Sequence, residues 1–548
     1  MALDMSPQQK ELGKQNFRQA TKELSRRGFL KGLLAGSAAL PVAAAAYYGY
    51  QYEKLQGKPV RTALIGAGDE GGVLVGEHNP KYLEFVAYSD IRPYNQKRIF
   101  EGEKVPSPRR GFNFHYGNDA EKKIKKFDDY KQLLADTSLG IEAVVIALPL
   151  HLHAPVAIEA LEAGKHVLCE KLMAWNIKQC KDMIATADRT GKILTIGHQR
   201  HYSLLYAQAS EAIKSAILGD IKHIRALWHR NNSWPKVDKD GKVIAGSLRD
   251  GWKPDIQPQD REALEADIRK RGYKSMEELV RWRLFNRTGG GLMAELGSHQ
   301  LDACSIFLGK AHPLAVSGVG GKFFYTDDRE VDDHVFVTFE FPGPNYYHKD
   351  KEGKPTKDID NKNDIVVVTY SSVNTNSFEK YGECVMGSRG TMVVEQEQSV
   401  MLFGEPDPNL KEPAAPRATA VGVTSGPAGQ PVLESTASYG GSSGPPGTKP
   451  AGAPADTSEP VSRGYREEME HFAYCIRMEQ EAPSDEKRRW QLEPHCHGRV
   501  AMADAIIALT SNQAMRKHER IVFKDEWFDP AKSAEVPDPD MIPEVIKG

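Results

Sequence analysis

The feature that most restricts the fold is a short apolar segment that runs directly into a group of glycines. Residues 60–65 are followed at once by Gly66, Gly68 and Gly71, and an apolar helical pattern comes next. Glycines at these three places allow a tight turn, a close approach of backbone N–H groups to a pyrophosphate, and close packing of a helix against the strand. The pattern therefore predicts the first strand, turn and helix of a doubly wound parallel sheet.

An acidic residue stands where a dinucleotide-binding sheet needs one. A second apolar strand, residues 84–89, ends at Asp90, about 20 positions after the last glycine. A carboxylate there accepts hydrogen bonds from the ribose hydroxyls of an adenine dinucleotide. Arg92 lies two positions later and offers a partner for a 2′-phosphate. The spacing predicts NAD as the cofactor and makes NADP the less favoured alternative.

Strand and helix patterns continue to alternate after this unit. Apolar strands at 143–148 and 166–169 are each preceded by a helical pattern. This rhythm predicts an α/β fold whose NAD-binding Rossmann domain, a doubly wound parallel sheet, covers residues 58–185.

The second half has a different pattern. Period-two alternation marks strand-like runs at 314–320, 334–341, 365–371, 383–386 and 391–395. These runs predict an open, mostly antiparallel sheet in an α+β domain for substrate binding and oligomerisation, built from residues 186–404 and 464–525. Between the two parts, residues 405–463 are rich in Pro, Gly, Ala, Ser and Thr, which predicts a mobile insertion. Residues 526–548 are expected to form a C-terminal tail.

The first 50 residues are laid out as an export signal. Polar residues precede Arg26 and Arg27, a Gly-Phe-Leu-Lys sequence follows, and residues 32–50 are weakly apolar. This layout resembles a twin-arginine signal, which predicts export of the folded chain by the twin-arginine machinery to the periplasm. The apolar run also has the length of a membrane anchor, so outward-facing attachment and retention on the cytoplasmic side stay open as alternatives.

Composition excludes some classes of function. The chain has 72 basic and 74 acidic residues, a net charge of -2, and no basic stripe, so nucleic-acid binding is not expected. None of its six cysteines forms a Cys-x-x-Cys pair, which argues against a disulfide framework. His495, Cys496 and His497 stand together, but no further ligand lies at a suitable spacing, and no metal site is predicted.

Polar residues follow the later strands of the predicted sheet, at the edge where ligands bind. They are Pro149, His151 and His153 after one strand, and Glu170 and Lys171 after the next. A lysine there reaches the face of a nicotinamide and a substrate hydroxyl, and its charge favours the alkoxide that precedes hydride loss. The alternative is a surface lysine paired with Glu170.

Two stretches resemble the Gfo/Idh/MocA oxidoreductase family. The first is the run 148–154 with Ala163-Gly-Lys-His-Val-Leu-Cys-Glu170-Lys171, where Leu172 replaces the proline of the family's Glu-Lys-Pro signature. The second is the triple-glycine turn at 289–291 followed by Glu295 and His299. The resemblance implies hydride transfer between a nicotinamide and a sugar, inositol or glycoside hydroxyl, and cofactor binding by Pro149, His153, Glu170 and Lys171.

The second stretch predicts an acid–base pair. Positions i and i+4 of a helix share one face, so Glu295 is expected to orient His299 while His299 removes the hydroxyl proton. Asp302, one turn further, either binds the substrate or braces the helix. His198, Arg200 and Arg283 are predicted substrate-binding residues. Lys171, His299 and Glu295 are therefore the predicted catalytic residues.

Export adds a constraint on the cofactor. Because free NAD is scarce outside the cytoplasm, we expect a tightly held NAD that is reduced and reoxidised in the same site. Two other functions stay open: redox-neutral glycoside cleavage through a keto intermediate, and non-catalytic sugar sensing. The family resemblance also implies a homo-oligomer.

Overall fold

The computed structural model describes residues 5–26, 59–103, 109–405, 421–425, 431–435, 463–481, 493–532 and 536–537. Residues 1–4 and 27–50 of the predicted export signal lie outside these residues. Among the helices that are described, none is both long and apolar enough to cross a bilayer.

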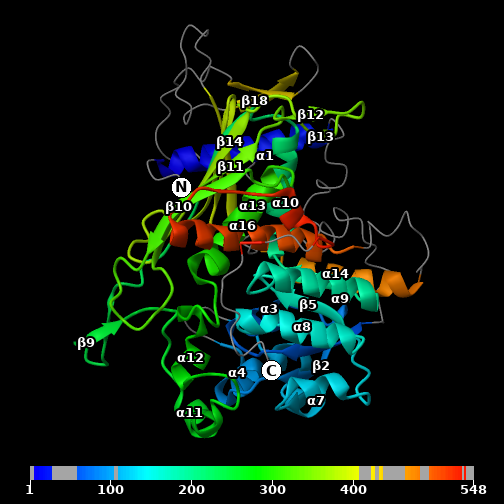
Figure 1. Ribbon diagram of the computed structural model, residues 1–548, viewed down its shortest axis with the longest axis vertical. Coiled ribbons are helices and arrows are strands. Elements are labelled where there is room, and N and C mark those ends of the chain that lie inside the picture. Colours follow the sequence, from blue (N-terminus) through cyan, green and yellow to red (C-terminus); the bar gives the residue numbers. More distant parts are fainter. Residues whose placement is uncertain are drawn as a thin grey trace, which may run out of the picture.

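The first domain is a six-stranded parallel sheet with helices on both faces (Figure 1). Its strands are β1 (Val60–Ile65), β2 (Leu83–Ser89), β3 (Lys125–Phe127), β4 (Ala143–Ile146), β5 (His166–Glu170) and β6 (Leu194–Gly197). They lie in the order β3-β2-β1-β4-β5-β6, so the order in which strands are added reverses between β1 and β4, and such sheets bind ligands at this point. The predicted doubly wound Rossmann sheet is confirmed.

Two groups of helices cover this sheet. One face carries α7 (Tyr130–Ala135), α8 (His153–Glu162) and α9 (Ile177–Thr190), and the other carries α3 (Asp69–Glu77) and α4 (Pro93–Glu101). Short helices α5 (Phe112–Tyr116) and α6 (Ala120–Lys123) lead into β3. Because β6 pairs with β5, the domain extends to about residue 198, beyond the predicted boundary at 185.

Helix α14 (Tyr465–Glu481) belongs to the first domain and not, as predicted, to the second. Its Met469, Phe472 and Ile476 are fully buried in one core with Leu64 and Val145 of the parallel sheet. An apolar helical stripe needs an apolar surface but does not specify which one, so its position in the chain could not reveal this contact.

The second domain is built on an eight-stranded sheet. Its strands are β7 (Ile221–His229), β10 (Ala315–Gly321), β11 (His334–Pro342), β14 (Ile365–Val373), β15 (Tyr381–Gly387), β16 (Gly390–Glu395), β17 (Ser399–Gly404) and β20 (Ile521–Val522). They lie in the order β17-β16-β15-β7-β14-β11-β10-β20, and every neighbouring pair is antiparallel except β14 and β7. The predicted open, mostly antiparallel sheet is confirmed.

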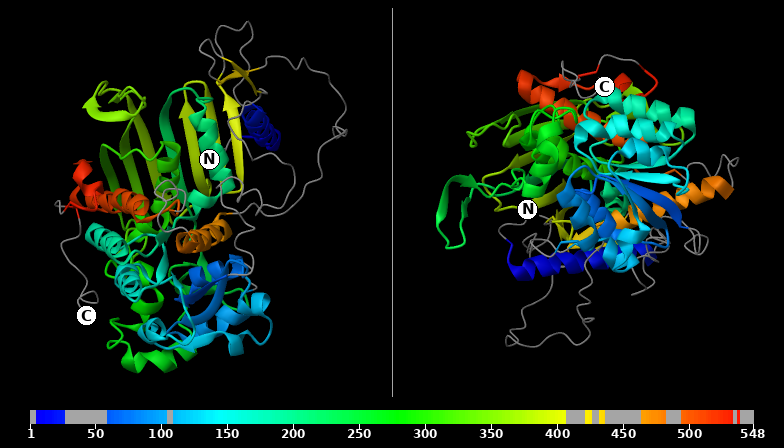
Figure 2. Two further views of the ribbon diagram at one scale, coloured as in Figure 1. Left: turned by 90° about the vertical axis from the view of Figure 1, so that its right-hand side faces the viewer. Right: turned by 90° about the horizontal axis from the view of Figure 1, so that it is seen from below.

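Helices α10 (Leu204–Lys214), α13 (Ser298–Phe307) and α16 (Gly498–Lys517) line the inner face of this sheet, on the side of the first domain (Figure 2). Helix α16 also packs against α9, and so joins the two domains. The last described helical turn, η7 (Asp525–Phe528), buries Trp527 against Phe523, so the first residues of the predicted tail are packed.

An N-terminal helix, α1 (Pro7–Arg26), lies along the edge strand β17 of the second sheet and also contacts α10. Asn16 donates a hydrogen bond to the carbonyl oxygen of Leu402 at 3.1 Å, and Lys10 lies 2.8 Å from the Glu395 carboxylate. Phe17 is buried. The described part of the predicted export segment therefore packs on the fold.

Smaller elements extend from the second domain. Two antiparallel pairs are β8 (Pro235–Val237) with β9 (Val243–Leu248) and β12 (Tyr347–Lys349) with β13 (Pro355–Ile359). Helices α11 (Pro258–Leu264) and α12 (Met276–Val280) lie beside the first domain. The segment predicted to be a mobile insertion contains one more pair, β18 (Val421–Ser425) with β19 (Pro431–Ser435), so it is not structureless throughout.

Candidate active site

The glycine turn after β1 is shaped for a phosphate group. Gly66 has a φ of +96°, and a Cβ there would lie 2.2 Å from the Ala147 carbonyl oxygen. A Cβ on Gly71 would lie 2.2 Å from the Gly66 carbonyl oxygen, whereas one on Gly68 would meet only Asn95 at 4.0 Å. Gly66 and Gly71 thus fix the turn and the helix packing, and Gly68 leaves open space. No side chain caps the start of α3, so its first N–H groups can receive an anion.

Asp90 holds this turn in place. Its carboxylate accepts hydrogen bonds from the backbone N–H of Ala67 and of Arg92, both at 2.7 Å, and from Asn95 at 3.1 Å. The guanidinium of Arg92 lies 2.9 Å from Asp260, a buried carboxylate. Arg92, the predicted alternative partner for a 2′-phosphate, is therefore already paired.

A cavity of about 1090 Å³ runs from the glycine turn to the second domain. It is lined by predicted cofactor-binding residues, namely Gly66, Gly68, Asp90, Pro149, His153, Glu170 and Lys171. Gly71 lies behind the turn, where it allows the helix packing just described. The segment between β9 and α13 forms the opposite wall with Trp252, Tyr273, Trp282 and Arg283. The site thus lies between the two domains.

The loops after β4 and β5 are tied together behind this cavity. The two ring nitrogens of His153 lie 2.8 Å from the Leu148 carbonyl oxygen and 2.7 Å from that of Leu172. The Glu170 carboxylate accepts the backbone N–H of Lys171 at 3.1 Å, and burial raises its pKa well above the ordinary value. His153 and Glu170 thus fix the backbone on which Lys171 is mounted.

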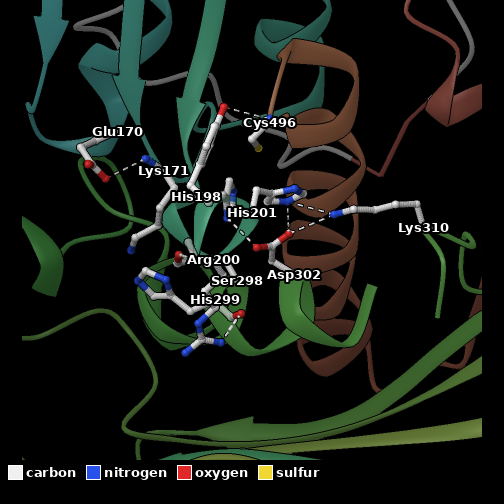
Figure 3. Close-up of polar contacts among 12 residues, drawn as sticks. Glu170, Lys171, His198, Arg200, His201, Ser298, His299, Asp302, Lys310 and Cys496 are labelled. Carbon is white, nitrogen blue, oxygen red and sulfur yellow. Dashed lines mark hydrogen bonds and ion pairs between the residues drawn. The ribbon is translucent and has the colours of Figure 1, made fainter. Parts of the chain in front are cut away.

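Lys171 does not form the predicted alternative pair with Glu170. Its Nζ donates a hydrogen bond to the backbone carbonyl oxygen of Glu295 at 2.8 Å. The Lys171–Leu172 peptide is cis. Figure 3 shows the lysine side chain extended toward the imidazole of His299. The two predicted catalytic groups therefore lie close together, with Lys171 in the wall of the cavity and His299 beside it but not among the lining residues.

His299 has the electrostatic surroundings of a neutral base. The residue is only 9% exposed, and its ring lies 5.5 Å from that of Trp228. Burial, and then the charges of Lys171 and Arg200, lower the pKa of His299 well below its ordinary value. A neutral imidazole beside a lysine ammonium can accept a proton from a hydroxyl group.

The structure differs from the prediction at Glu295. Its carboxylate lies 3.0 Å from Nε of Arg283, and no hydrogen bond joins it to His299 in the described part of the chain. Residues Met293–Gly297 form a π-helical turn, so the i, i+4 rule of an α-helix does not apply between positions 295 and 299. Glu295 acts here through its carbonyl oxygen on Lys171, and through its carboxylate on Arg283.

Arg200 is not at the cavity, contrary to the prediction. It is 1% exposed and lies 2.9 Å from the Glu383 carboxylate and 2.6 Å from that of Glu397. It also donates a hydrogen bond to the carbonyl oxygen of His299 (Figure 3). A buried guanidinium needs charged or polar partners. Because its partners lie on the second sheet and on the backbone of His299, the Arg200 side chain points away from the cavity.

His198 and Asp302 are also buried away from the cavity. Asp302 lies 2.6 Å from Nε2 of His201 and 3.3 Å from Nζ of Lys310 (Figure 3). Of the two roles predicted for Asp302, the structure favours bracing the helix over binding the substrate. Arg283 lines the cavity as predicted, with its guanidinium 4.3 Å from the centre of the Trp282 ring.

Sequence reasoning missed the partners of Arg200. Glu383 is fully buried in the otherwise apolar strand β15, and Glu397 is buried just after β16. An acidic residue inside an apolar strand was the available signal, because a buried carboxylate requires a partner. The sequence could not identify Arg200 as the partner of Glu383, because 183 residues separate the two.

Comparisons with known proteins agree with this architecture. Residues 60–198 match the model of the GFO/IDH/MocA family described as an NAD-binding Rossmann fold, and residues 263–346 match the GFO/IDH/MocA C-terminal domain. An inositol dehydrogenase homologue from Azotobacter vinelandii, solved with NADH and myo-inositol, has a similar fold with a TM-score of 0.53 at 15% identity, over 86% of this chain and 99% of that one.

Curated relatives match shorter stretches. An uncharacterized oxidoreductase, ORF334, of Rhizobium meliloti is 34% identical over 127 residues, which is 23% of this chain and 37% of the relative. A glycosyl hydrolase family 109 protein of Shewanella baltica is 26% identical over 249 residues, which is 42% of this chain and 50% of the relative. The chain thus spans half or less of the length of these relatives.

Proposed function

Because the chain belongs to the GFO/IDH/MocA oxidoreductase family, we propose that it is an NAD-dependent oxidoreductase acting on a sugar, inositol or glycoside hydroxyl. The observation that carries the proposal is the single cavity that joins the glycine turn after β1 to Lys171. Its volume exceeds the usual range for a small-molecule site, as a dinucleotide together with a second ligand requires.

The residues along the cavity fit a nicotinamide dinucleotide. The open space at Gly68 and the uncapped start of α3 suit a pyrophosphate, and Asp90 lines the cavity where a ribose would lie. The pairing of Arg92 with Asp260 supports NAD over NADP, because a 2′-phosphate would have to compete with a buried carboxylate. When bound, the nicotinamide would accept a hydride from the substrate carbon and return it.

Lys171 and His299 carry the proton chemistry in this proposal. His299 is neutral and accepts the proton of the substrate hydroxyl, while the Lys171 ammonium stabilises the developing alkoxide. The Glu295 carbonyl oxygen orients Lys171, and Arg200 holds the backbone carbonyl of His299. Arg283 and Trp282 offer a charged and an aromatic surface to the substrate at the opposite wall.

A redox-neutral version of the reaction is the second candidate, favoured by the relative named as a glycosyl hydrolase family 109 protein. Oxidation of one hydroxyl to a keto group acidifies the neighbouring C–H, which allows elimination of the glycosidic leaving group. Water then adds, and the same hydride returns to the keto carbon, so no external oxidant is consumed.

We also propose that the protein is exported by the twin-arginine machinery to the periplasm and that it keeps its NAD tightly bound. The support is the sequence around Arg26 and Arg27. Fractionation and N-terminal sequencing test it, and a chain found intact in the cytoplasm would contradict it.

A homo-oligomer formed through the second sheet is a further part of the proposal. It is supported by exposed apolar residues on the outer face, among them Val319 at 56% and Phe336 at 44% exposure. Light scattering after gel filtration tests this part, and a monomer would contradict it.

Alanine variants test the catalytic assignment. Lys171→Ala and His299→Ala should each lose turnover on sugars and glycosides by about 100-fold or more while still binding NADH. Lys178→Ala, an exposed lysine on α9, serves as the matched control and should keep full turnover. Unchanged turnover in either active-site variant would contradict its assigned role.

A further inference from the structure

A group of metal-binding side chains lies behind the catalytic helix, outside the cavity. One ligand atom each from His198, Asp302 and Asp504 lies within 4.8 Å of the others, and all three residues are buried. Nδ1 of His198 is 3.8 Å from a carboxylate oxygen of Asp302. Ligand atoms about 2.0–2.2 Å from one ion stand roughly 3–4 Å apart, so this spacing suits a shared cation.

These three side chains have polar atoms that the surrounding protein does not satisfy. Neither ring nitrogen of His198, one oxygen of Asp302 and neither oxygen of Asp504 takes part in a hydrogen bond within the described residues. All of these atoms are buried. Buried polar atoms normally have partners, and the unsatisfied atoms here all belong to good metal ligands that face one another.

The charges of the cluster also favour a bound cation. The other oxygen of Asp302 is paired with His201 and with Lys310 at 3.3 Å, whereas Asp504 accepts no hydrogen bond from a basic side chain in the described part of the chain. Two facing carboxylates in such a site require either a shared proton or a cation between them.

We propose that His198, Asp302 and Asp504 form a binding site for a divalent transition-metal ion. The imidazole nitrogen selects such an ion over sodium, potassium or calcium, which prefer oxygen ligands. The ion would be held by the His198 imidazole and the two carboxylates, without any change in oxidation state. Cys496 and His201 lie next to Asp504 as a second set of potential ligands.

The site would join three separate parts of the chain. His198 follows β6 of the first domain, Asp302 lies one turn beyond His299 on α13, and Asp504 lies on α16. Figure 3 shows His198, His201 and Asp302 directed toward one another behind the helix that carries His299. An ion here would fix that helix against the end of the parallel sheet. The sequence predicted no metal, because these ligands are separated by more than a hundred residues.

Metal content tests the proposal directly. The full chain is produced with added Zn²⁺ or Mn²⁺, purified without chelator, and analysed by mass spectrometry of the elements. We expect about one ion per chain in the wild type and less than about a tenth in Asp504→Asn and His198→Gln. Asn has the size and shape of Asp but no charge, so that variant should fold without the metal. Glu468→Gln is the matched control, because Glu468 is an equally buried carboxylate outside the ligand set, and it should keep the ion.

Thermal unfolding gives a second measurement that does not depend on activity. Chelator-treated wild type should show a higher Tm after addition of Zn²⁺ or Mn²⁺, and Asp504→Asn should not. A wild type that takes up neither ion and shows no shift would overturn the proposal, and would leave a shared proton between the carboxylates. Equal metal content in wild type, Asp504→Asn and His198→Gln would overturn it as well.

Discussion

Replacing Arg200 tests whether its buried contacts stabilise the helix that carries His299. Arg200 is 1% exposed and pairs with Glu383 and Glu397 while it binds the His299 carbonyl. Arg200→Met keeps the length of the side chain and removes the charge. Breaking a buried ion pair by removing one partner costs about 3–5 kcal/mol, a large part of the roughly 5–15 kcal/mol that stabilises a folded domain.

Arg463 provides the matched control for this experiment. It pairs with the same carboxylate, Glu397, at 2.9 Å, but its side chain is 42% exposed. Solvent screens such a pair, so Arg463→Met should cost no more than about 1 kcal/mol. Both variants replace an arginine that pairs with Glu397 by methionine. They differ in how deeply the arginine is buried and in the additional contacts that Arg200 makes.

Denaturant unfolding followed by circular dichroism measures the difference. We expect a clearly lower midpoint for Arg200→Met than for Arg463→Met, and partial recovery when Glu383→Gln is added to Arg200→Met. The loss should grow from mildly acidic to mildly alkaline pH, because the carboxylates that lose their cation then become charged. If Arg200→Met is no less stable than Arg463→Met, the view that Arg200 anchors the catalytic helix is refuted.

Three further predictions follow from the same geometry. Gly71→Ala should lower the melting temperature, because its Cβ would lie 2.2 Å from the backbone of the turn. Gly68→Ala should keep the melting temperature and weaken NAD binding in a titration. Equal losses of stability in the two variants would contradict the different roles of these glycines. Burial raises the pKa of Glu383 to about 7, so the folded state holds its proton more tightly and stability falls as pH rises from about 4.5 to 7. Glu383→Gln should abolish this loss, which amounts to about 3 kcal/mol over the whole interval, in measurements of the unfolding free energy against pH. An unchanged pH dependence would count against the raised pKa. In the pH profile of kcat/KM, the apparent pKa of the acid limb should lie well below the ordinary pKa of histidine, because His299 is buried and lies beside two cations. This apparent pKa should rise in Arg200→Met. An apparent pKa near 6.5 in the wild type would contradict a neutral, buried base.

The sequence was informative where function depends on neighbouring residues. Gly66, Gly68 and Asp90 could be assigned because a strand, a turn and a second strand define their positions locally. Lys171 could be placed because the carboxyl end of a parallel strand is where a ligand binds. All of these residues line the cavity that the structure contains.

The sequence was less informative where position depends on distant contacts. The i, i+4 rule failed for Glu295 and His299 because a π-helical turn changes the register just before the helix. Arg200 is polar and follows a strand, as a binding residue would, but its partners on β15 and after β16 bury it. The placement of α14 against the first domain likewise rests on packing that an apolar stripe alone does not specify.

The central claim is that one cavity holds a nicotinamide dinucleotide against Lys171, with His299 next to that lysine. The most direct measurement is the nucleotide content of the purified chain, followed by its near-ultraviolet spectrum on addition of a panel of sugars and glycosides. We predict roughly one NAD per chain and the appearance of reduced nicotinamide with a substrate in the wild type, with reduction at least about 100-fold slower in Lys171→Ala. A wild-type chain that carries no nucleotide and does not bind added NAD or NADH would contradict the account.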